Sequence, residues 1–402
     1  MTRILFLVPH LPYPPHQGGA LRNFGLIDGL AKRGHRIGLL TFAEPDQPAL
    51  AETPLAELCS PAQAIPAPLR SIRDRLRDLL DGHTDMARRF WSREYREALV
   101  HILRDHSFDV VHLDLEMAGY LPTIHQYAPG VRLVYDSLNA EYDLQRRIAL
   151  RDLRIPSRWP AAAYSLIQTA RLTELETDLC RTVSAVSACS EADAGKLGQL
   201  KHHTPITVVP NAISVADYSP DTRPAELPHP AIVFTGKMDF RPNVDAALWF
   251  VDDILLRIRL AVPDATLTVV GQKPHARLDR LRGLPGVILT GFVPEVKPYL
   301  AAADVYVAPL RMGSGTRFKL LEAMAMKKAI VSTHLGAEGL AVEHGREMLL
   351  ADTPEEFAAA VIALLGDPDR RKSLGEAASV LVSANYDWDA IIPKMEKVYQ
   401  AG

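Results

Sequence analysis

The chain has 402 residues, which is too long for one ordinary hydrophobic core and suits two domains of typical size. Its composition, 48 % apolar and 23 % charged, is that of a globular protein, and its net charge of −3 excludes the global basic field of a nucleic-acid-binding protein. Three widely spaced cysteines, and the lack of an apolar run of about 18 residues, predict a cytoplasmic protein with free thiols that does not cross a membrane.

An alternation of strands and helices starts near the beginning of the chain. Residues 4–8 form an all-apolar run, which is typical of a buried parallel strand and is too short for a signal peptide. A proline-rich loop with Gly18 and Gly19 follows, and a helix is predicted from about residue 20 to residue 33, where Gly34 ends it. Further buried strands are predicted at residues 36–41, 109–113, 131–135, 183–187 and 206–209.

A basic segment lies between two of these strands. Residues 70–104 contain nine arginines and six acidic residues, with Phe90 and Trp91 among them. A basic amphipathic helix with aromatic residues can lie on an anionic membrane, so one interpretation is a peripheral contact with the inner face of the membrane. The interleaved acidic residues slightly favour the other interpretation, which is a solvated helix.

A stiff connection separates two arrays of strands and helices. Residues 219–230 contain four prolines, which interrupt regular structure and favour an extended chain. Beyond this linker, strands are predicted at residues 231–235, 266–270, 287–290, 305–308 and 330–332. This alternation predicts an α/β protein with two doubly wound, Rossmann-like domains, at residues 1–218 and 231–385.

The most informative stretch is a glycine loop that opens into a helix, at residues 313–325. Its glycines let backbone amides approach an anion, and the start of the helix presents free N–H groups and the positive end of its dipole. Lys319 and Glu322 are three residues apart and share one face of the helix. This pattern suits a nucleotide-sugar, with the diphosphate at the loop and the ribose hydroxyls on a solvent-facing Glu322. The alternative is an ordinary helix with a solvated Lys–Glu pair.

Several motifs occur together in one order. They are Gly18-Gly19 followed by Gly34-His35, the segments 187–193, 208–213 and 290–300, and the Leu-Leu-Glu-Ala-Met-Ala sequence that ends at Ala325. In this order they resemble the retaining GT-B glycosyltransferases (glycosyltransferase family 4, glycosyl transferases group 1). The resemblance implies two doubly wound, Rossmann-like domains facing across a cleft, with a C-terminal helix, residues 386–402, packed back on the N-terminal domain.

The activity that this resemblance implies is transfer of a sugar from a nucleotide-sugar to a hydroxyl of a glycan, a lipid-linked saccharide or a small molecule. Transfer is expected with retention of configuration and without a metal or other cofactor. Negative charge builds on the diphosphate as the glycosidic bond breaks, so positive groups near it matter most. Two alternatives stay open: a sugar-nucleotide epimerase of the same fold, which needs paired acid and base groups, and a non-catalytic module that binds a glycan or a partner.

The resemblance also implies the site residues on the donor side. Lys237 falls on the first basic position of the family, Asn243 falls on the second, and Arg241 is a possible substitute for it. The two glutamates of the family signature fall on Ser314 and Glu322. The complete predicted donor set is Gly18, Gly19, Gly236, Lys237, Arg241, Asn243, Ser314, Gly315, Thr316, Arg317, Lys319 and Glu322.

Three residues are predicted to take part in catalysis: Asp136, Lys237 and Glu322. Asp136 stands where retaining members have a histidine that meets the donor sugar, and it could accept hydrogen bonds from sugar hydroxyls or stabilise an oxocarbenium charge. Candidates on the acceptor side are His112, Asn139 and Glu141. A lone histidine after a buried strand is more often a core residue, and Asn139 and Glu141 could instead cap the next helix.

Overall fold

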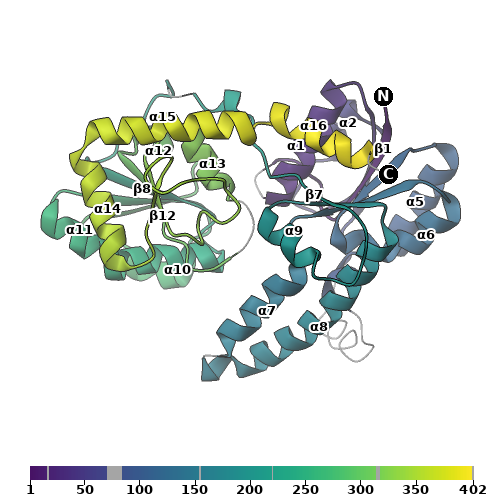
Figure 1. Ribbon diagram of the computed structural model, residues 1–402, viewed down its shortest axis with the longest axis horizontal. Helices are drawn as coiled ribbons and strands as arrows, with labels where there is room; N and C mark the ends of the chain where they lie inside the picture. Colours follow the sequence, from purple (N-terminus) through teal and green to yellow (C-terminus); the bar gives the residue numbers. More distant parts are fainter. Residues whose placement is uncertain (16–17, 70–83, 154, 220, 314–316, 401–402) are drawn as a thin grey trace. The chain divides into compact units, whose positions relative to one another are not determined.

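The computed structural model describes residues 1–15, 18–69, 84–153, 155–219, 221–313 and 317–400. The chain divides into two compact units, drawn in Figure 1. The N-terminal unit consists of Met1–Pro210 and Ile391–Gly402, and the C-terminal unit is Asn211–Ala390. Each unit contains one parallel β-sheet with helices on its faces. In the part of the chain described here, every helix is too short or too polar to cross a bilayer.

The sheet of the N-terminal unit has seven parallel strands in the order β3-β2-β1-β4-β5-β6-β7. The direction of strand order reverses between β1 and β4, and the edge beyond the carboxyl ends of these strands is the usual place for a ligand in such sheets. The strands are β1 (Arg3–Val8), β2 (Arg36–Ala43), β3 (Cys59–Pro66), β4 (Val110–Leu113), β5 (Arg132–Ser137), β6 (Ala185–Ala188) and β7 (Ile206–Val208).

Strand β3 is absent from the sequence prediction. It lies at the edge of the sheet and carries Pro61 and Pro66, which an edge strand tolerates and a central strand does not. Its side chains are only partly buried, so it lacks the continuous apolar run of the central strands. The other six strands coincide with predicted ones to within a few residues, because all of them except the partly buried edge strand β7 are buried and mostly apolar.

Helices cover both faces of this sheet. Helix α5 packs on the sheet through an apolar face, because its buried residues recur at helical spacing. From this face Tyr95 stacks on Phe42 of β2, with ring centroids 4.5 Å apart. Helices α7 and α8 form an antiparallel hairpin that projects away from the sheet (Figure 1). The helices are α1 (Gly18–Lys32), α2 (Leu55–Leu58), α4 (Asp85–Arg89), α5 (Arg93–Asp105), α6 (Leu121–Tyr127), α7 (Glu141–Asp152), α8 (Trp159–Thr182) and α9 (Glu191–Leu197).

The sheet of the C-terminal unit has six parallel strands in the order β10-β9-β8-β11-β12-β13. The first five along the chain coincide with the predicted strands, and the two-residue β13 is too short to give a sequence signal. The strands are β8 (Ala231–Thr235), β9 (Thr266–Val270), β10 (Val287–Gly291), β11 (Val305–Ala308), β12 (Ile330–Ser332) and β13 (Leu349–Leu350).

Two helices of the C-terminal unit have clear sequence signals where they begin. Thr353 and Glu356 form a capping box at the start of α14, and the side chain of Asp367 caps α15. The helices are α10 (Arg241–Trp249), α11 (Leu256–Ala261), α12 (Lys297–Ala302), α13 (Phe318–Ala325), α14 (Pro354–Gly366) and α15 (Pro368–Asn385), and a π-helical turn (Phe250–Leu255) joins α10 to α11. The last helix, α16 (Trp388–Gln400), begins in this unit and lies mostly in the N-terminal unit.

The boundaries between the units differ from the predicted ones at 218 and 386. Residues 211–218 belong to the C-terminal unit, because Ile213 donates its N–H to Tyr386 and Tyr218 reaches Glu322. The predicted linker also lies on this unit, where the N–H of Ala225 bonds the carbonyl of Pro298. Helix α16 joins the N-terminal unit from Ile391 onward.

Candidate active site

In the C-terminal unit, Lys319 connects two strand ends at the carboxyl edge of the sheet. It lies in the first turn of α13, which follows β11, and its Nζ donates to the carbonyl of Thr235 at 2.6 Å, at the end of β8. The same Nζ donates to Oδ1 of Asn243 at 2.7 Å and lies 4.6 Å from the centre of the Phe234 ring. Lys319 is therefore held inside the unit at the position where ligands bind such sheets.

Gly236 makes this arrangement possible. A Cβ at this position would lie 2.6 Å from Nδ2 of Asn243 and 2.7 Å from Nζ of Lys319, so any larger residue would displace one of them. Asn243 also donates from Nδ2 to the carbonyl of Lys237 at 2.9 Å. The predicted donor residues Gly236, Asn243 and Lys319 thus meet in one cluster although 76 residues separate Asn243 from Lys319.

The surroundings of Lys319 change its acid strength. Burial, together with the nearby charge of Arg317, lowers the pKa of Lys319 to about 7, while Glu322 acts in the opposite direction. Near neutral pH the ammonium group is therefore poised between its charged and neutral forms. A bound anion would favour the charged form.

Glu322 lies one turn further along α13 and is partly buried, so it is less exposed than the solvent-facing carboxylate that the sequence pattern indicates. Tyr218 donates a hydrogen bond from its hydroxyl to Oε1 of Glu322 at 3.1 Å. Burial raises the pKa of Glu322, while Tyr218, Lys319 and Lys297 counteract the rise. The sequence could not show this, because Tyr218 falls in a segment that we expected to belong to the other domain.

The remaining predicted donor residues of this unit surround the cluster. Lys237 is exposed, with Nζ 3.6 Å from Asp239, and Arg241 is the first residue of α10. Arg317 precedes α13, and its guanidinium packs against Gly313, which has a positive φ of 116°. Ser314, Gly315 and Thr316 lie outside the described residues.

In the N-terminal unit, a buried ion pair lies at the point where the strand order reverses. The guanidinium of Arg22, on α1, donates to the two oxygens of Asp136, at the end of β5, over 2.6 and 2.7 Å. It also donates to the carbonyl of Val209 at 2.9 Å, and the hydroxyl of Ser187 donates to Asp136. Burial alone would raise the pKa of Asp136, but Arg22 and His112 hold it well below its usual range.

This geometry changes the role expected for Asp136. Its carboxylate is fully buried and is engaged by Arg22 and Ser187, so it serves as the counterion of Arg22 in this structure. Contact with a donor sugar would require Arg22 to move, and a catalytic role for Asp136 stays a prediction. The sequence does carry a signal for the pair, since Arg22 falls on the same face of α1 as the buried Leu26 and Leu30.

His112, on β4, is fully buried beside this ion pair. Its Nδ1 is 2.9 Å from the hydroxyl of Tyr399 on α16, and its Nε2 is 3.6 Å from Oδ2 of Asp136. Asp114 follows on the same chain segment and accepts a hydrogen bond from Nδ2 of Asn23 at 3.1 Å. Burial raises the pKa of Asp114 well above its usual value, and the charge of Glu116 adds to the rise.

Asn139 and Glu141 lie next to each other at the start of α7. Nδ2 of Asn139 donates to Oε1 of Glu141 at 3.0 Å. The cap of α7 comes instead from Glu176 on α8, which accepts the N–H of Tyr142 at 2.8 Å and that of Glu141 at 3.2 Å. Burial raises the pKa of Glu141 to about 8 and that of Glu176 to about 7.

The glycines at the start of α1 are packed closely. A Cβ on Gly19 would lie 3.4 Å from the side chain of Leu138, in the loop after β5. Gly18 and Gly19 open the helix at the same edge of the sheet as Arg22 and Asp136. The free N–H groups at this end of α1 are therefore a second place where an anion can be held.

Three side chains at this edge form a candidate metal group within the described residues. His112, Asp114 and Asp136 each offer one ligand atom, and these atoms lie within 4.8 Å of one another. The guanidinium of Arg22 already occupies both oxygens of Asp136, and a divalent cation here would be repelled by it. The group fits a metal poorly for this reason.

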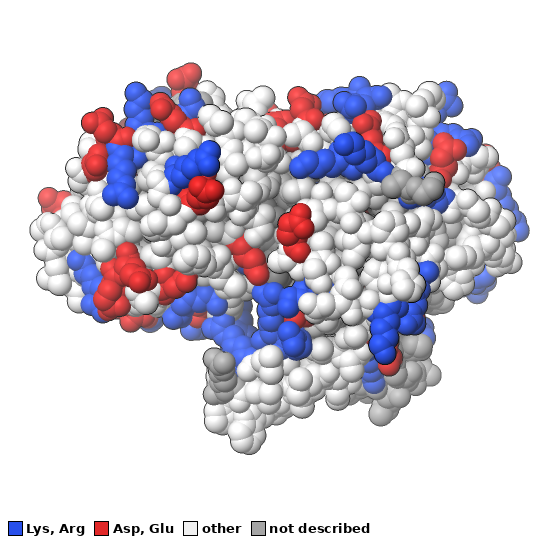
Figure 2. All heavy atoms as spheres, viewed as in Figure 1, with Lys and Arg blue, Asp and Glu red and all other residues white. Residues whose placement is uncertain are grey.

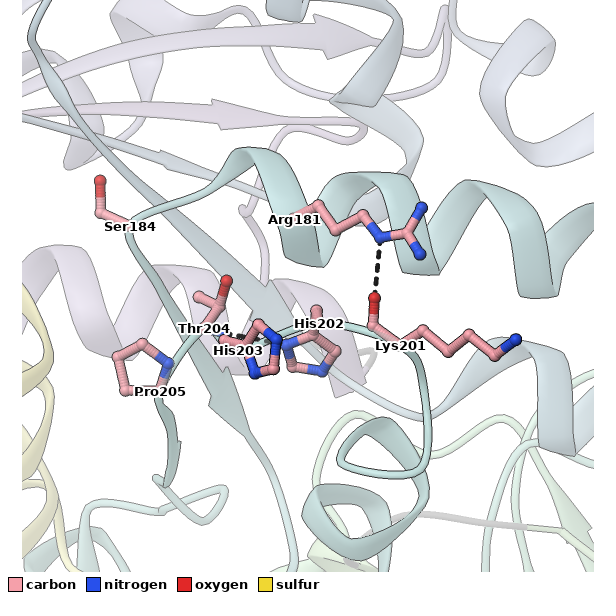
Figure 3. Close-up of a pocket in the computed structure, with 7 residues that line it drawn as sticks. All are labelled: Arg181, Ser184, Lys201, His202, His203, Thr204 and Pro205. Carbon is pink, nitrogen blue, oxygen red and sulfur yellow. Dashed lines mark hydrogen bonds between the residues drawn. The ribbon is translucent and has the colours of Figure 1, made fainter.

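A cavity of about 850 Å³ lies elsewhere in the N-terminal unit (Figure 3). It is lined by the end of α8 and by the segment that leads into β7, with the residues Arg181, Ser184, Lys201, His202, His203, Thr204 and Pro205. These residues precede β6 and β7, so the cavity faces the amino ends of the strands. It is separate from the carboxyl edge where His112 and Asp136 lie.

Comparisons with known proteins identify the class. A model of glycosyltransferase family 4 matches residues 17–217, which is half of the chain, and a model of glycosyl transferases group 1 matches residues 229–367. The sucrose-phosphate synthase of Thermosynechococcus elongatus has a TM-score of 0.74 at 17 % identity, covering 100 % of this chain and 98 % of its own. The Anabaena protein HepE, in complex with UDP and glucose, has a TM-score of 0.64 at 16 % identity over 100 % of both chains.

Curated relatives agree with this class. A phosphatidyl-myo-inositol mannosyltransferase of Propionibacterium freudenreichii is 25 % identical, over 96 % of this chain and 93 % of its own length. An uncharacterized protein in the cps region of Klebsiella pneumoniae is 22 % identical, and the match spans only 42 % of its length. With its two Rossmann-like units, the protein is a glycosyltransferase of the GT-B type. It belongs to glycosyltransferase family 4.

Proposed function

We propose that this glycosyltransferase takes its sugar from a nucleoside diphosphate sugar bound at the Lys319 cluster, and transfers it with retention of configuration. The observation that supports this most is the position of Lys319. The family pattern places its second basic residue at Asn243, and Nζ of Lys319 lies 2.7 Å from the amide oxygen of that residue. A cation from α13 thus stands beside the position where the expected cation is missing, and Arg241 need not replace it.

In this proposal the positive groups do the main chemical work. Lys319, Lys237 and the N–H groups at the start of α13 stabilise the charge that develops on the leaving diphosphate. The carboxylate of Glu322, one turn deeper, accepts hydrogen bonds from the ribose hydroxyls. Asp136 is not free to attack the sugar while it holds Arg22, so leaving-group stabilisation carries the reaction.

The relatives suggest the classes of donor and acceptor. HepE binds UDP and glucose, and the Propionibacterium relative is named for phosphatidyl-myo-inositol, which is a lipid. We therefore propose a nucleotide-sugar donor and a saccharide or lipid-linked acceptor. An epimerase is not favoured, since the buried His112 and Asp136 engage Tyr399 and Arg22 instead of forming an open acid–base pair. A non-catalytic module is also not favoured, since the donor cluster is assembled.

The described part of residues 70–104 gives little support to the membrane contact that we considered for this segment. Residues 70–83 lie outside the described residues. In α4 and α5, Arg89 pairs with Asp85 at 2.9 Å and Arg93 pairs with Glu97 at 2.8 Å. These pairs favour a solvated helix, and a lipid contact through this segment stays a prediction, as does a cytoplasmic location.

A nucleotide panel tests the proposed function. UDP, GDP and ADP are added in turn to the purified protein, and its melting temperature is measured. A ligand at about 100 times its dissociation constant stabilises the folded state by about 2.7 kcal/mol, so one nucleotide is expected to raise the melting temperature clearly. The protein should also slowly hydrolyse the matching nucleotide-sugar. Stabilisation by none of the three, with no hydrolysis, would leave a binding module as the better proposal.

Removing metal ions is expected to leave turnover unchanged. The diphosphate has Lys319 and Lys237 for neutralisation, and Arg22 disfavours a cation at His112 and Asp136. Turnover is measured after dialysis against excess EDTA, with and without added Mg²⁺ or Mn²⁺. A loss of activity that either metal restores would contradict the prediction. If His112→Gln then abolished that restoration, the metal would be located at the buried group.

A further inference from the structure

The end of the α7–α8 hairpin carries a cluster of exposed apolar side chains. Of the fifteen large hydrophobic residues that are exposed in the described part of the chain, six lie between residues 150 and 167. Trp159 is 58 % exposed and Leu150 is 51 % exposed, and the others are Leu153, Ile155, Leu166 and Ile167. Single exposed apolar residues are ordinary, but six on one helical hairpin are a concentration of the kind that marks an interaction surface. We call these six residues the hairpin tip.

Helices α7 and α8 pack against each other and are joined by hydrogen bonds, and these contacts hold the hairpin tip in place. Ala149 and Ala162 are fully buried, and Nε2 of Gln145 donates to the hydroxyl of Ser165 at 3.0 Å. Glu176 fixes the start of α7 to α8. At the end itself, Nε1 of Trp159 donates to the carbonyl of Leu153 at 3.1 Å. The indole is thereby anchored while most of its ring surface stays in solvent.

Arginines outnumber acidic residues around the hairpin tip. Residues 144–173 contain six arginines and one acidic residue, Asp152. Asp152 is buried and pairs with Arg158 at 3.3 Å. At the base of α7, both Arg146 and Arg147 lie 2.8 Å from Asp143. In Figure 2 the end of the hairpin is mostly white, so few charged side chains lie at its extremity on the face shown.

We propose that the hairpin tip docks on an anionic lipid surface. Tryptophan and aliphatic side chains enter the boundary between headgroups and acyl chains, and arginines beside them bind lipid phosphates. A second copy of the chain is a poorer occupant, because two tips with the same positive charge repel each other. This inference does not depend on the proposed donor or reaction.

The dimensions of the hairpin suit such docking. Helix α8 has 24 residues and is therefore about 36 Å long. An interfacial helix enters a bilayer by only about 5–10 Å, so the tip can be immersed while the sheet of its unit stays in water. The six residues of the hairpin tip belong to the last turns of α7, the first turns of α8 and the connection between them.

Vesicle co-sedimentation of the full chain tests the docking. We expect binding at low salt to vesicles of equimolar phosphatidylglycerol and phosphatidylcholine, weaker binding to pure phosphatidylcholine, and release as added salt screens the arginines. The double variant Ile155→Ser/Trp159→Ser should bind the anionic vesicles at least about tenfold more weakly. Neither serine can replace the apolar surface that Ile155 and Trp159 bury in the lipid. Its melting temperature should fall only slightly, since both side chains are largely exposed and only the hydrogen bond from Trp159 to Leu153 is lost.

A matched control removes two exposed apolar side chains from a different part of the protein. Leu256 and Leu260, in the C-terminal unit, are 67 % and 79 % exposed, so Leu256→Ser/Leu260→Ser should leave vesicle binding unchanged. Arg93→Gln/Arg96→Gln should also leave it unchanged, which separates the hairpin from residues 70–104. Absence of binding to anionic vesicles at low salt would overturn the proposal. So would equal binding by the hairpin variant, or a dimer of the parent that the hairpin variant loses.

Discussion

Replacing Lys319 with methionine is expected to lower turnover by about a hundredfold to a thousandfold, the usual effect of removing one preorganised donor to a developing negative charge. Methionine keeps most of the side-chain volume and the contact with the Phe234 ring, and it removes only the charge and its hydrogen bonds. Turnover is measured as release of the nucleoside diphosphate that stabilises the protein in the nucleotide panel.

The pH dependence of nucleotide affinity reports on the same ammonium group. Burial lowers the pKa of Lys319 to about 7, and a bound diphosphate should raise it. The charged form therefore binds more tightly, so affinity should fall as the pH rises from about 7 to about 8.5. At the upper end of this range, binding should take up a proton, which calorimetry in two buffers of different ionisation enthalpy detects. In Lys319→Met both effects should disappear.

Lys328 provides a matched control for this variant. Its Nζ donates to the carbonyl of Ala301 at 2.6 Å, and burial lowers its pKa as well, but it lies away from the strand ends of the cluster. Lys328→Met should change the melting temperature and leave turnover and the pH dependence of nucleotide affinity unchanged. If both lysine variants kept full turnover, Lys319 would be an internal structural residue and the proposed diphosphate site would be contradicted.

Replacing Glu322 with alanine is expected to weaken use of the donor by about tenfold to a hundredfold. A hydrogen bond between a carboxylate and a hydroxyl contributes roughly 1.5–3 kcal/mol, and Glu322 is proposed to make such bonds to the ribose. Glu322→Gln keeps the shape and loses the charge, so its kcat/KM should fall between those of the parent and of the alanine variant. The measurement is kcat/KM for the nucleotide-sugar.

A variant of Tyr218 provides the control for Glu322→Ala. The hydroxyl of Tyr218 donates to Glu322 at 3.1 Å, so removal of the carboxylate also leaves that hydroxyl without its acceptor. Tyr218→Phe removes the hydrogen bond and keeps the carboxylate, and it should change kcat/KM only a few times. Nucleotide affinity and turnover that are unchanged in Glu322→Ala would show that the loop and α13 are ordinary scaffold.

The regular parts of the fold could be predicted from the sequence, because their signals are local. The central strands are continuous apolar runs, as in residues 4–8 and 231–235, and a parallel sheet needs such runs wherever helices cover both faces. Strand β3 failed this test because an edge strand is only partly buried and admits prolines. The donor loop could be recognised because its glycines and the following helix are contiguous in the chain.

The pairing of side chains could not be predicted in the same way. Arg22 and Asp136 are 114 residues apart, and the sequence gives no distance between them. Asp136 was placed at the right strand end, but the partner that occupies its oxygens comes from a different helix. Lys319 and Asn243 show the same limit, since each was expected to bind the donor and neither was expected to bind the other. A charged residue on the buried face of a helix, such as Arg22, indicates that a buried partner of opposite charge lies nearby.

The position of helix α16 determines when the N-terminal unit can be completed during synthesis. Ile392 packs where a Cβ on Gly29 would lie 2.5 Å away, and Glu396 pairs with Arg33 across 363 residues of sequence. Tyr399 supplies the partner of the buried Nδ1 of His112. On a ribosome, the unit that emerges first is therefore finished last, because it must wait for its final helix while the whole C-terminal unit is translated. A fragment that stops at Pro210 would leave Gly29 and His112 without this cover, so we expect it to be less stable than the complete N-terminal unit.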